Sequence, residues 1–359
     1  MSIFIALLIL SLLVFFHELG HFFVARLFGV HVEVFSIGFG KRIYTKKLGD
    51  TQWSISTIPL GGYVKMKGQD DSDPKAISCD EDSYSSKKPW QRILILLAGP
   101  FANFFVAFLL YFSASQIGVL PSPLFDYGHY LSPVVGGFDK ESPVINSELK
   151  KGDRILEIDN TPIKFWEDVG KTIQKGGDSL HFKVLRENGT LADFDIKPIT
   201  KKIKNRFGET INRKLIGIYP QSQKMHFSLI EGLAFAWHET IYSSTFIFQG
   251  IKKMLTGAVS SKSVGGIFSI MDVTAKASKA GILPLILLTA LISVNFGILN
   301  LLPIPALDGG HIMFNLYEII SGRPPNEEIM YRLTLFGWVL LISLMLLGLY
   351  NDINRIILG

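Results

Sequence analysis

Residues 12–29, "LLVFFHELGHFFVARLFG", decide the fold class and pose the first chemical question. The run is apolar enough to lie in hydrocarbon, yet it carries His17, Glu18 and His21 near its middle. Ionisable or metal-binding side chains at membrane depth are costly, so their default interpretation is functional. These three residues therefore have to be explained together with the membrane spans around them.

Four apolar windows predict a polytopic α-helical membrane protein. The 359-residue chain is 48% hydrophobic with a mean hydropathy of +0.31, which is too apolar for an ordinary soluble protein. Each window is long enough to cross about 30 Å of hydrocarbon as a helix. The first lacks the basic flank and cleavage site of a secretory signal, so we expect it to stay in the mature protein. The expected transmembrane helices cover residues 1–28, 93–117, 281–312 and 329–350.

Positive charge is concentrated after the first window. The formal net charge is +5, and Lys and Arg are dense over residues 26–92. The positive-inside rule assigns such a segment to the cytoplasm. We therefore expect a multi-pass protein of the cell inner (cytoplasmic) membrane, with both chain termini in the periplasm and residues 118–280 outside.

Residues 126–200 read as a soluble α+β domain inserted between the second and third windows. The stretch "ESPVINSELKKGDRILEIDNTPIKFWEDV" combines a short helix pattern, a Lys-Gly-Asp turn, an alternating strand and an Asn-Thr-Pro turn. This order resembles the PDZ domains of bacterial proteases, which bind extended peptides by adding a strand to a sheet edge. Any other small α+β domain is the alternative.

The segment over residues 201–280 is expected to hold a linker and one amphipathic helix. Residues 201–225 are basic and read as the linker, whereas residues 228–256 favour a helix lying on the membrane surface. A fifth span is the alternative for the second stretch. The pair His238-Glu239 fits an exposed helix face, because no second histidine follows it at helical spacing.

The spacing within "HELGH" predicts half of a zinc site. His17 and His21 are four residues apart, so on a helix both imidazoles project from one face and can bind one zinc ion. Glu18 stands beside them as a candidate general base. The alternative is a satisfied polar patch in a transporter.

A third zinc ligand is expected after the third apolar window. Pro303 and Pro305 bend the chain out of helix in "SVNFGILNLLPIPALDGGHIMFN", residues 293–315, and Asp308 follows. A catalytic zinc takes three protein ligands and keeps one position open. Asp308 is the first choice for the third ligand and His311 is the rival. Asn295 and Asn300 lie upstream in the same stretch.

Five motifs in order resemble the bacterial site-2 proteases of the regulator of sigma-E protease type. They are "HELGH", "FSIGFGKRIYTKKLGDTQWSISTIPLGGYVKMKG", "AGPFANFFVAF", the PDZ-like stretch and "NLLPIPALDGG", and they cover nearly the whole chain. The resemblance implies that zinc is held by His17, His21 and Asp308, with Glu18 as the catalytic glutamate. It also implies that Asn300 and Asn295 hold substrate backbone or stabilise developing charge.

The same resemblance implies how substrate reaches the site. Residues 33–68 match a membrane-reentrant β-loop that aligns substrate as an extended strand. Substrates would be single-span membrane proteins, of the anti-sigma factor type or remnant signal peptides. Two departures stand out: only one PDZ domain fits where several relatives have two, and Gly265-Gly266 stands where the family often has Gly-Pro.

The expected activity is therefore zinc-dependent intramembrane endopeptidase cleavage, with the site toward the cytoplasmic side. The expected partners are the lipid bilayer, single-span substrates and peptides that bind the PDZ domain, but no nucleic acid. Two other hypotheses stay open from the residues. One is a membrane transporter or metal carrier with an intramembrane His/Glu site, and the other is a non-catalytic scaffold bearing a PDZ domain.

Overall fold

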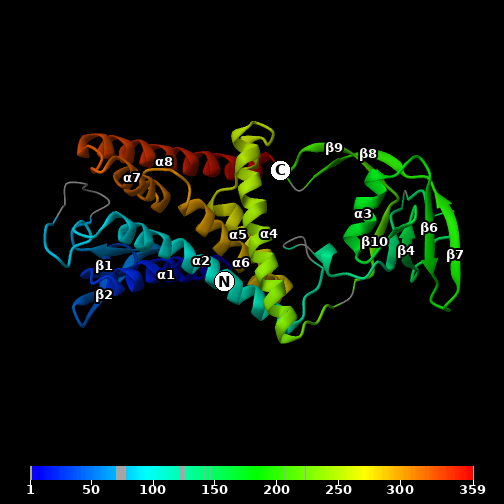
Figure 1. Ribbon diagram of the computed structural model, residues 1–359, viewed down its shortest axis with the longest axis horizontal. Helices are drawn as coiled ribbons and strands as arrows, with labels where there is room; N and C mark the ends of the chain where they lie inside the picture. The colour runs from blue at the N-terminus through cyan, green and yellow to red at the C-terminus, as the bar shows by residue number, and fades with distance from the viewer. Residues whose placement is uncertain are drawn as a thin grey trace. The chain divides into compact units, whose positions relative to one another are not determined.

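The computed structural model describes residues 2–69, 78–121, 125, 127–140, 142–145, 147–205, 207–222 and 224–358. The chain forms two compact units, which are described separately (Figure 1). Unit 1 comprises Met1–Phe112, Ala236–Gln249 and Ser260–Gly359. Unit 2 comprises Ser113–Phe235 and Gly250–Val259.

Four helices of unit 1 are long and apolar enough to cross a bilayer. They are α1 (Ser2–Leu27), α2 (Pro89–Ile117, whose last residues belong to unit 2), α6 (Ile282–Asn300) and α8 (Glu327–Leu358). Their apolar stretches are 19 to 31 residues long. About 20 apolar residues span the hydrocarbon layer as a helix, so the expected four spans are confirmed within the described residues. The protein is a multi-pass membrane protein.

An antiparallel sheet follows α1 and packs on it. Its strands β1 (Val32–Leu48) and β2 (Thr51–Met66) are long because both fold back on themselves. Ile37 pairs with Ile55 on one side and with Gly62 on the other. The first half of β1 is thus flanked by both halves of β2, and residues 62–66 form an edge of the sheet. The expected β-structure over residues 33–68 is present.

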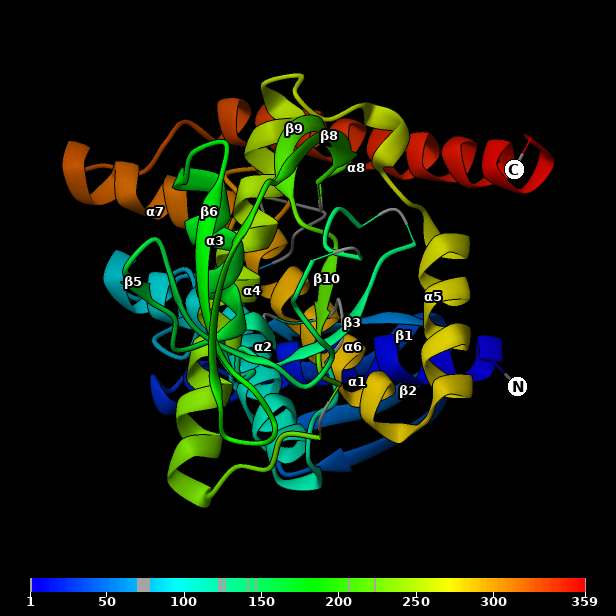
Figure 2. The same ribbon diagram turned by 90° about the vertical axis from the view of Figure 1, so that its right-hand side faces the viewer.

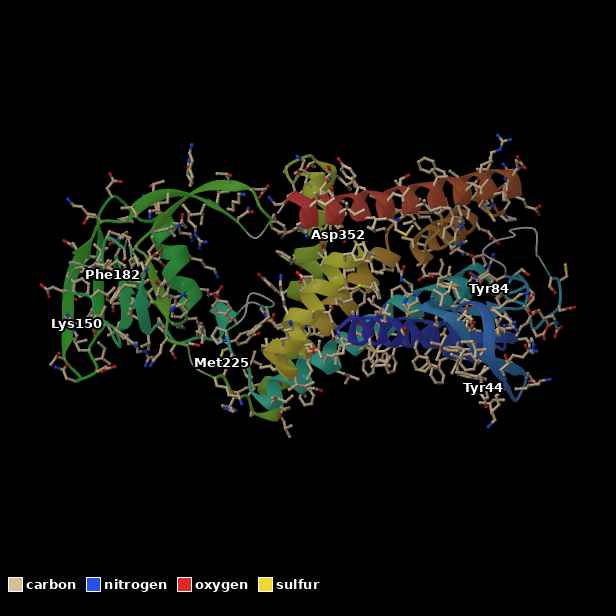
Figure 3. All side chains as sticks on the ribbon, turned by 180° about the vertical axis from the view of Figure 1, so that it is seen from behind. Tyr44, Tyr84, Lys150, Phe182, Met225 and Asp352 are labelled. Atoms are coloured by element: carbon tan, nitrogen blue, oxygen red, sulfur yellow. The ribbon has the colours of Figure 1, made fainter. Side chains whose placement is uncertain are left out.

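The described part of unit 1 contains three further α-helical segments. They are α5 (Ile267–Ala280), α7 (Asp308–Ser321) and the stretch Ala236–Gln249 of α4 (Leu229–Leu255). Asp352, labelled in Figure 3, accepts hydrogen bonds from the N–H groups of Gly266 and Ser269 at the start of α5, both at 3.0 Å. This contact caps α5 and ties it to the end of α8.

Helix α4 matches the expected amphipathic helix closely. Ser228 and Glu231 form a capping box, in which Glu231 accepts from the backbone N–H of Ser228 at 2.9 Å. In the described part of the chain α4 is not among the helices that meet the length and hydropathy of a span. Whether it lies on the membrane surface stays a prediction.

The described part of unit 2 contains small antiparallel sheets, helix α3 and the end segments of α2 and α4. A four-stranded sheet has the order β5-β4-β6-β7, from β4 (Arg154–Ile158), β5 (Thr161–Pro162), β6 (Leu180–Leu185) and β7 (Leu191–Ile196). Helix α3 (Trp166–Lys175) lies beside these strands (Figure 2). Its buried Val169 and Ile173 join Phe182, labelled in Figure 3, in an apolar core.

The prediction of a linker over residues 201–225 is not met. This segment carries most of β8 (Ile199–Lys204), all of β9 (Thr210–Leu215) and β10 (Ile218–Pro220). β10 pairs with β3 (Val135–Phe138), and Ile216 is buried in the core. The hairpin β8–β9 is largely exposed and basic, so its composition resembles a linker although its two strands pair along their whole length.

Candidate metal centre

Helix α1 carries the two histidines of "HELGH" on one buried face. His17 and His21 are 8% and 6% exposed, and their Nε2 atoms lie 3.2 Å apart. Residues four apart on a helix lie one above the other, so the sequence spacing brings both rings to one point. Burying two imidazoles in an apolar helix requires polar partners for their nitrogen atoms.

Close packing of α2 against α1 closes the site on one side. A Cβ atom added at Gly20 of α1 would lie 2.2 Å from the carbonyl oxygen of Ala98. A Cβ atom at Gly99 of α2 would lie 2.3 Å from Nε2 of His21 and 2.8 Å from Cε1 of His17. Glycine is required at both positions, because a Cβ atom at Gly20 would meet the backbone of α2 and a Cβ atom at Gly99 would meet the imidazole rings.

Asp308 reaches the histidines from the start of α7. After α6 ends at Asn300, the segment with Pro303 and Pro305 forms tight turns and delivers Asp308 as the first residue of α7. Its Oδ2 lies 3.2 Å from Nε2 of His17, and its Oδ1 lies 3.5 Å from Nε2 of His21. A carboxylate at a helix N-terminus is favoured by the helix dipole.

These three side chains fit a zinc ion. Their ligand atoms lie within 4.8 Å of one another. Oδ2 of Asp308 is buried and lacks a hydrogen-bond partner within the described residues, although His17 is only 3.2 Å away. The short distance and the missing hydrogen bond are consistent if Oδ2 of Asp308 and Nε2 of His17 both point at a third position and not at each other. Two imidazoles and one carboxylate are a ligand set of catalytic zinc sites, which keep a fourth position open.

The other sequence candidates lie at different distances from this cluster. Glu18 and His311 line the same cavity, and Nδ2 of Asn300 lies 3.4 Å from Nε2 of His17. His311 is not part of the cluster found among the described residues, so Asp308 and not His311 supplies the third ligand. Asn295 is half-buried on α6 and is not among the residues found to line the cavity.

His238 and Glu239 lie apart from this cluster, on α4. Glu239 is fully buried and accepts from Nδ1 of His238 at 3.0 Å, whereas the His238 side chain is 40% exposed. The expectation of an exposed pair therefore holds for His238 only.

The cavity in front of the cluster has a volume of about 570 Å³. The edge segment 62–66 of the β1–β2 sheet forms one wall, and Thr334 and Trp338 of α8 form part of another. The cluster is thus reached through a space bounded by a strand edge and a transmembrane helix.

Sequence comparison identifies the protein family of this chain. The model of Peptidase family M50 matches residues 5–344 of the chain. The chain belongs to Peptidase family M50. A Campylobacter jejuni protein named "Putative zinc metalloprotease Cj1068" is 42% identical over 352 residues, which cover 98% of this chain and 92% of that protein. A Helicobacter pylori (strain J99 / ATCC 700824) protein named "Putative zinc metalloprotease" is 37% identical over 364 residues, which cover 98% of this chain and 99% of that protein.

The M50 assignment and the geometry agree on the enzyme class. The protein is a zinc metalloprotease, and His17, His21 and Asp308 form its metal site. The peptidase family favours the protease hypothesis over the transporter and the scaffold. The expected cofactor, zinc, is confirmed by the relatives and by the ligand set.

Sequence reasoning missed the contribution of α2 to this M50 site. Nδ1 of His21 lies 2.8 Å from the carbonyl oxygen of Ile95, and Nδ1 of His17 lies 3.1 Å from the amide of Asn103. Ile95, Gly99 and Asn103 are spaced by four and form one stripe of the helix. An asparagine inside an apolar span was the signal that could have found this stripe.

Proposed function

We propose that this metalloprotease is an intramembrane endopeptidase of the site-2 protease, regulator of sigma-E protease type. It would cleave peptide bonds in the transmembrane segments of single-span membrane proteins. The observation that carries the proposal is the position of the zinc ligands. His17 and His21 lie within the apolar stretch Phe4–Leu27 of α1, so the metal site is built on a membrane span.

The edge segment 62–66 supports a substrate bound as an extended strand. This segment pairs with β1 on one side only and lines the cavity on the other. A transmembrane helix hides its peptide bonds in backbone hydrogen bonds and must unwind before cleavage. A strand edge offers replacement hydrogen bonds to the unwound backbone. We therefore propose that β1 and β2 form the membrane-reentrant β-loop that aligns the substrate.

The residues of the cavity divide the chemistry between them. A bound zinc ion supplies a Lewis acid for the scissile carbonyl and lowers the pKa of a water molecule toward neutrality. Glu18 lines the cavity one residue after His17, so its carboxylate can accept the proton of the attacking water. Glu18 then delivers this proton to the leaving amine.

Two asparagines of α6 are proposed to hold the substrate. Asn300 ends the helix 3.4 Å from His17, close enough for its amide to reach a substrate backbone beside the metal site. It would donate to the carbonyl oxygen on which negative charge develops. Asn295, five residues earlier, is proposed to contact the substrate farther from the cleaved bond.

Unit 2 is proposed to be a single PDZ domain that selects substrates. A groove of about 290 Å³ lies between α3 and residues 213–219. Apolar side chains line it, including Val169, Ile173 and Ile218. The backbone N–H and C=O of Lys214 both bond the side chain of Gln174, at 3.2 and 2.6 Å. This strand edge thus has hydrogen-bonding groups that an extended peptide could use in place of Gln174.

The basic segment 26–92 supports an orientation in the cell inner membrane. We propose periplasmic termini, a periplasmic unit 2 and a metal site toward the cytoplasmic side. The proposed substrates are anti-sigma factor-type proteins already trimmed outside the membrane, or remnant signal peptides. The proposed surface position of α4 would place its apolar side chains, such as Trp237 (66% exposed), against lipid.

Glu18→Gln tests the proposal. An amide cannot take the proton from water, so cleavage of a single-span substrate in proteoliposomes should fall by about 10²-fold or more, while the zinc content stays at the wild-type level. Gln91→Glu, an exchange of the same size at the start of α2, is the matched control and should cleave normally. Substantial cleavage by Glu18→Gln would contradict the assigned role.

A further inference from the structure

Helix α7 carries a row of polar side chains along one face. Asp308, His311, Asn315 and Glu318 are spaced by three, four and three residues, which is the spacing of neighbours on a helix surface. This face is turned toward the protein, because Asn315 is buried and the Glu318 side chain is only 18% exposed. Apolar side chains such as Ile320, which is 87% exposed, lie on the outside. Helix α7 therefore keeps its ionisable groups inside and its apolar groups outside, as a helix beside lipid does.

Glu318, near the end of this row, forms an ion pair with Arg92 of α2. Nη2 of Arg92 donates to both carboxylate oxygens of Glu318, at 2.7 and 2.8 Å. The Arg92 side chain is 16% exposed, and its Nε is buried without a hydrogen-bond partner within the described residues. A largely buried charge is costly unless an opposite charge lies beside it. Glu318 supplies that charge across 226 positions of the sequence.

The ion pair joins α7 to the same stripe of α2 that contacts the zinc-binding histidines. Arg92, Ile95 and Gly99 are spaced by three and four residues, so they share one face of α2. Arg92 lies about 10 Å along α2 from Gly99, and Glu318 lies about 15 Å along α7 from Asp308, at about 1.5 Å per residue. The two helices are thus linked at the metal centre and again about 10–15 Å away from it.

The second link fixes the direction of α7. The first turn of the helix is packed closely, because a Cβ atom at Gly309 would lie 2.3 Å from the carbonyl oxygen of Leu302. Farther along α7 the buried residue is Asn315, and its amide donates to the carbonyl oxygen of His311 in the same helix at 2.8 Å. A helix held only at its first turn can pivot about that turn. A contact ten residues later prevents the pivot, and Asp308 lies at the pivot itself.

We propose that Arg92 and Glu318 are a positioning pair for the metal centre. By fixing α7 against α2, the pair holds the carboxylate of Asp308 at ligand distance from the histidines of α1. Neither residue touches the metal, so both act through the helices that carry them. Groups outside the ligand set change metal affinity by about 10- to 100-fold, and we expect the lower end for a pair at this distance. The inference rests on the zinc ligands and not on the proposed membrane substrates.

Zinc affinity of the full-length protein tests the role. Arg92→Met with Glu318→Leu removes both charges, so no unpaired charge is left buried and the protein should fold. Apolar contact fixes no particular distance, so zinc binding should weaken by about tenfold in competition with a chromogenic chelator. Arg92→Glu with Glu318→Arg exchanges the charges and should restore the affinity to within about threefold of the wild type.

A second ion pair of similar length and burial supplies the matched control. Lys253 donates to both carboxylate oxygens of Glu209 at 2.7 Å, and the Glu209 side chain is 19% exposed. Both residues belong to unit 2, whereas the metal centre belongs to unit 1. Lys253→Met with Glu209→Leu should therefore leave the zinc affinity unchanged.

The visible spectrum of protein loaded with Co²⁺ supplies a readout that a loss of overall stability would not move. Co²⁺ can occupy a zinc site, and its absorption bands report the number and geometry of its ligands. At saturating Co²⁺ the bands should differ from the wild type in the apolar variant of Arg92 and Glu318 and return in the exchanged variant. Wild-type zinc affinity with a wild-type spectrum in the apolar variant would overturn the proposal. So would equal losses of affinity in this variant and in the control, or an exchanged variant that folds but binds zinc as weakly as the apolar one.

Discussion

The metal cavity of unit 1 and the groove of unit 2 are built on opposite principles. The cavity has a volume of about 570 Å³ and contains buried polar groups from α1 and α7. Helix α2 packs against these groups, and the three helices are far apart in the sequence. The groove, about 290 Å³, lies between one helix and one strand segment and is lined largely by apolar side chains. The first arrangement fixes polar atoms at a metal site, and the second leaves an apolar surface that we propose binds a peptide.

The difference predicts unequal tolerance to change. Each polar atom in the metal cavity depends on a particular partner, as His21 depends on the carbonyl oxygen of Ile95. A buried polar group that loses its partner costs about 1–3 kcal/mol. A peptide in the proposed binding groove would be held by apolar contact area, which declines gradually as atoms are removed. Single substitutions should therefore abolish function in unit 1 and only adjust it in unit 2.

Removing a zinc ligand should have the largest effect. His21→Ala and Asp308→Ala should reduce the zinc content of purified protein from about one ion per chain to background, because only two ligands remain. Metal analysis of detergent-purified protein measures this directly. His311→Ala, which alters the same cavity without touching the ligand set, should keep its zinc. Full zinc in His21→Ala would refute the ligand assignment.

Adding one methyl group to α2 should have the next largest effect. Gly99→Ala places a carbon where His21 Nε2 lies 2.3 Å away, so we expect zinc affinity to fall by about tenfold or more. Overpacking should also destabilise the fold by about 1–3 kcal/mol. Gly250→Ala is the control on α4, since its nearest neighbour, Phe207, lies 3.7 Å away. Chelator competition and thermal unfolding compare the two, and similar behaviour would show that α2 does not confine the rings.

Removing unit 2 should change selection and leave the metal site intact. Val119 and Met225 exchange two backbone hydrogen bonds, at 2.9 and 2.8 Å, so the chain can be rejoined across this pair. Residues 121–223 would be replaced by about four Gly and Ser residues, a common hairpin length. The shortened protein should bind zinc normally and cleave spans that carry a folded external domain, whereas we expect the whole protein to reject them. Unchanged discrimination between short and folded tails would remove unit 2 from the filter.

A change within the groove should have the smallest effect. Gln174→Ala frees the backbone groups of Lys214 for a peptide, so binding of an apolar, extended peptide should strengthen by about two- to tenfold. Fluorescence anisotropy of a labelled peptide with the full-length protein gives the affinity. Lys171→Ala, whose side chain pairs with Glu167 elsewhere on α3, is the control. Weaker binding by Gln174→Ala would mean that the peptide uses Gln174 itself.

Local patterns in the sequence were enough to predict the chemical centre. His17 and His21 are separated by one helical turn, and Asp308 follows a proline-broken span, so each could be recognised without its neighbours. The four spans follow equally from length and hydropathy. These features depend on contiguous residues.

The contacts that were missed join segments far apart in the chain. Asn103 meets His17 across 86 positions, and β3 pairs with β10 across about 80. No periodicity in one segment reveals its partner in another. The exposed hairpin β8–β9 is a regular structure that the sequence did not indicate. Its alternating Lys, Thr and Ile side chains bury little surface, so its composition predicted a linker.

The position of the cut bond tests the central claim most directly. Wild-type protein and Glu18→Gln would be incubated with a single-span substrate in proteoliposomes, and the products would be identified by mass spectrometry. The account predicts one or a few cuts inside the apolar stretch of the substrate, and none with Glu18→Gln. Cuts confined to the soluble flanks, or the same cuts with Glu18→Gln, would contradict an intramembrane zinc protease.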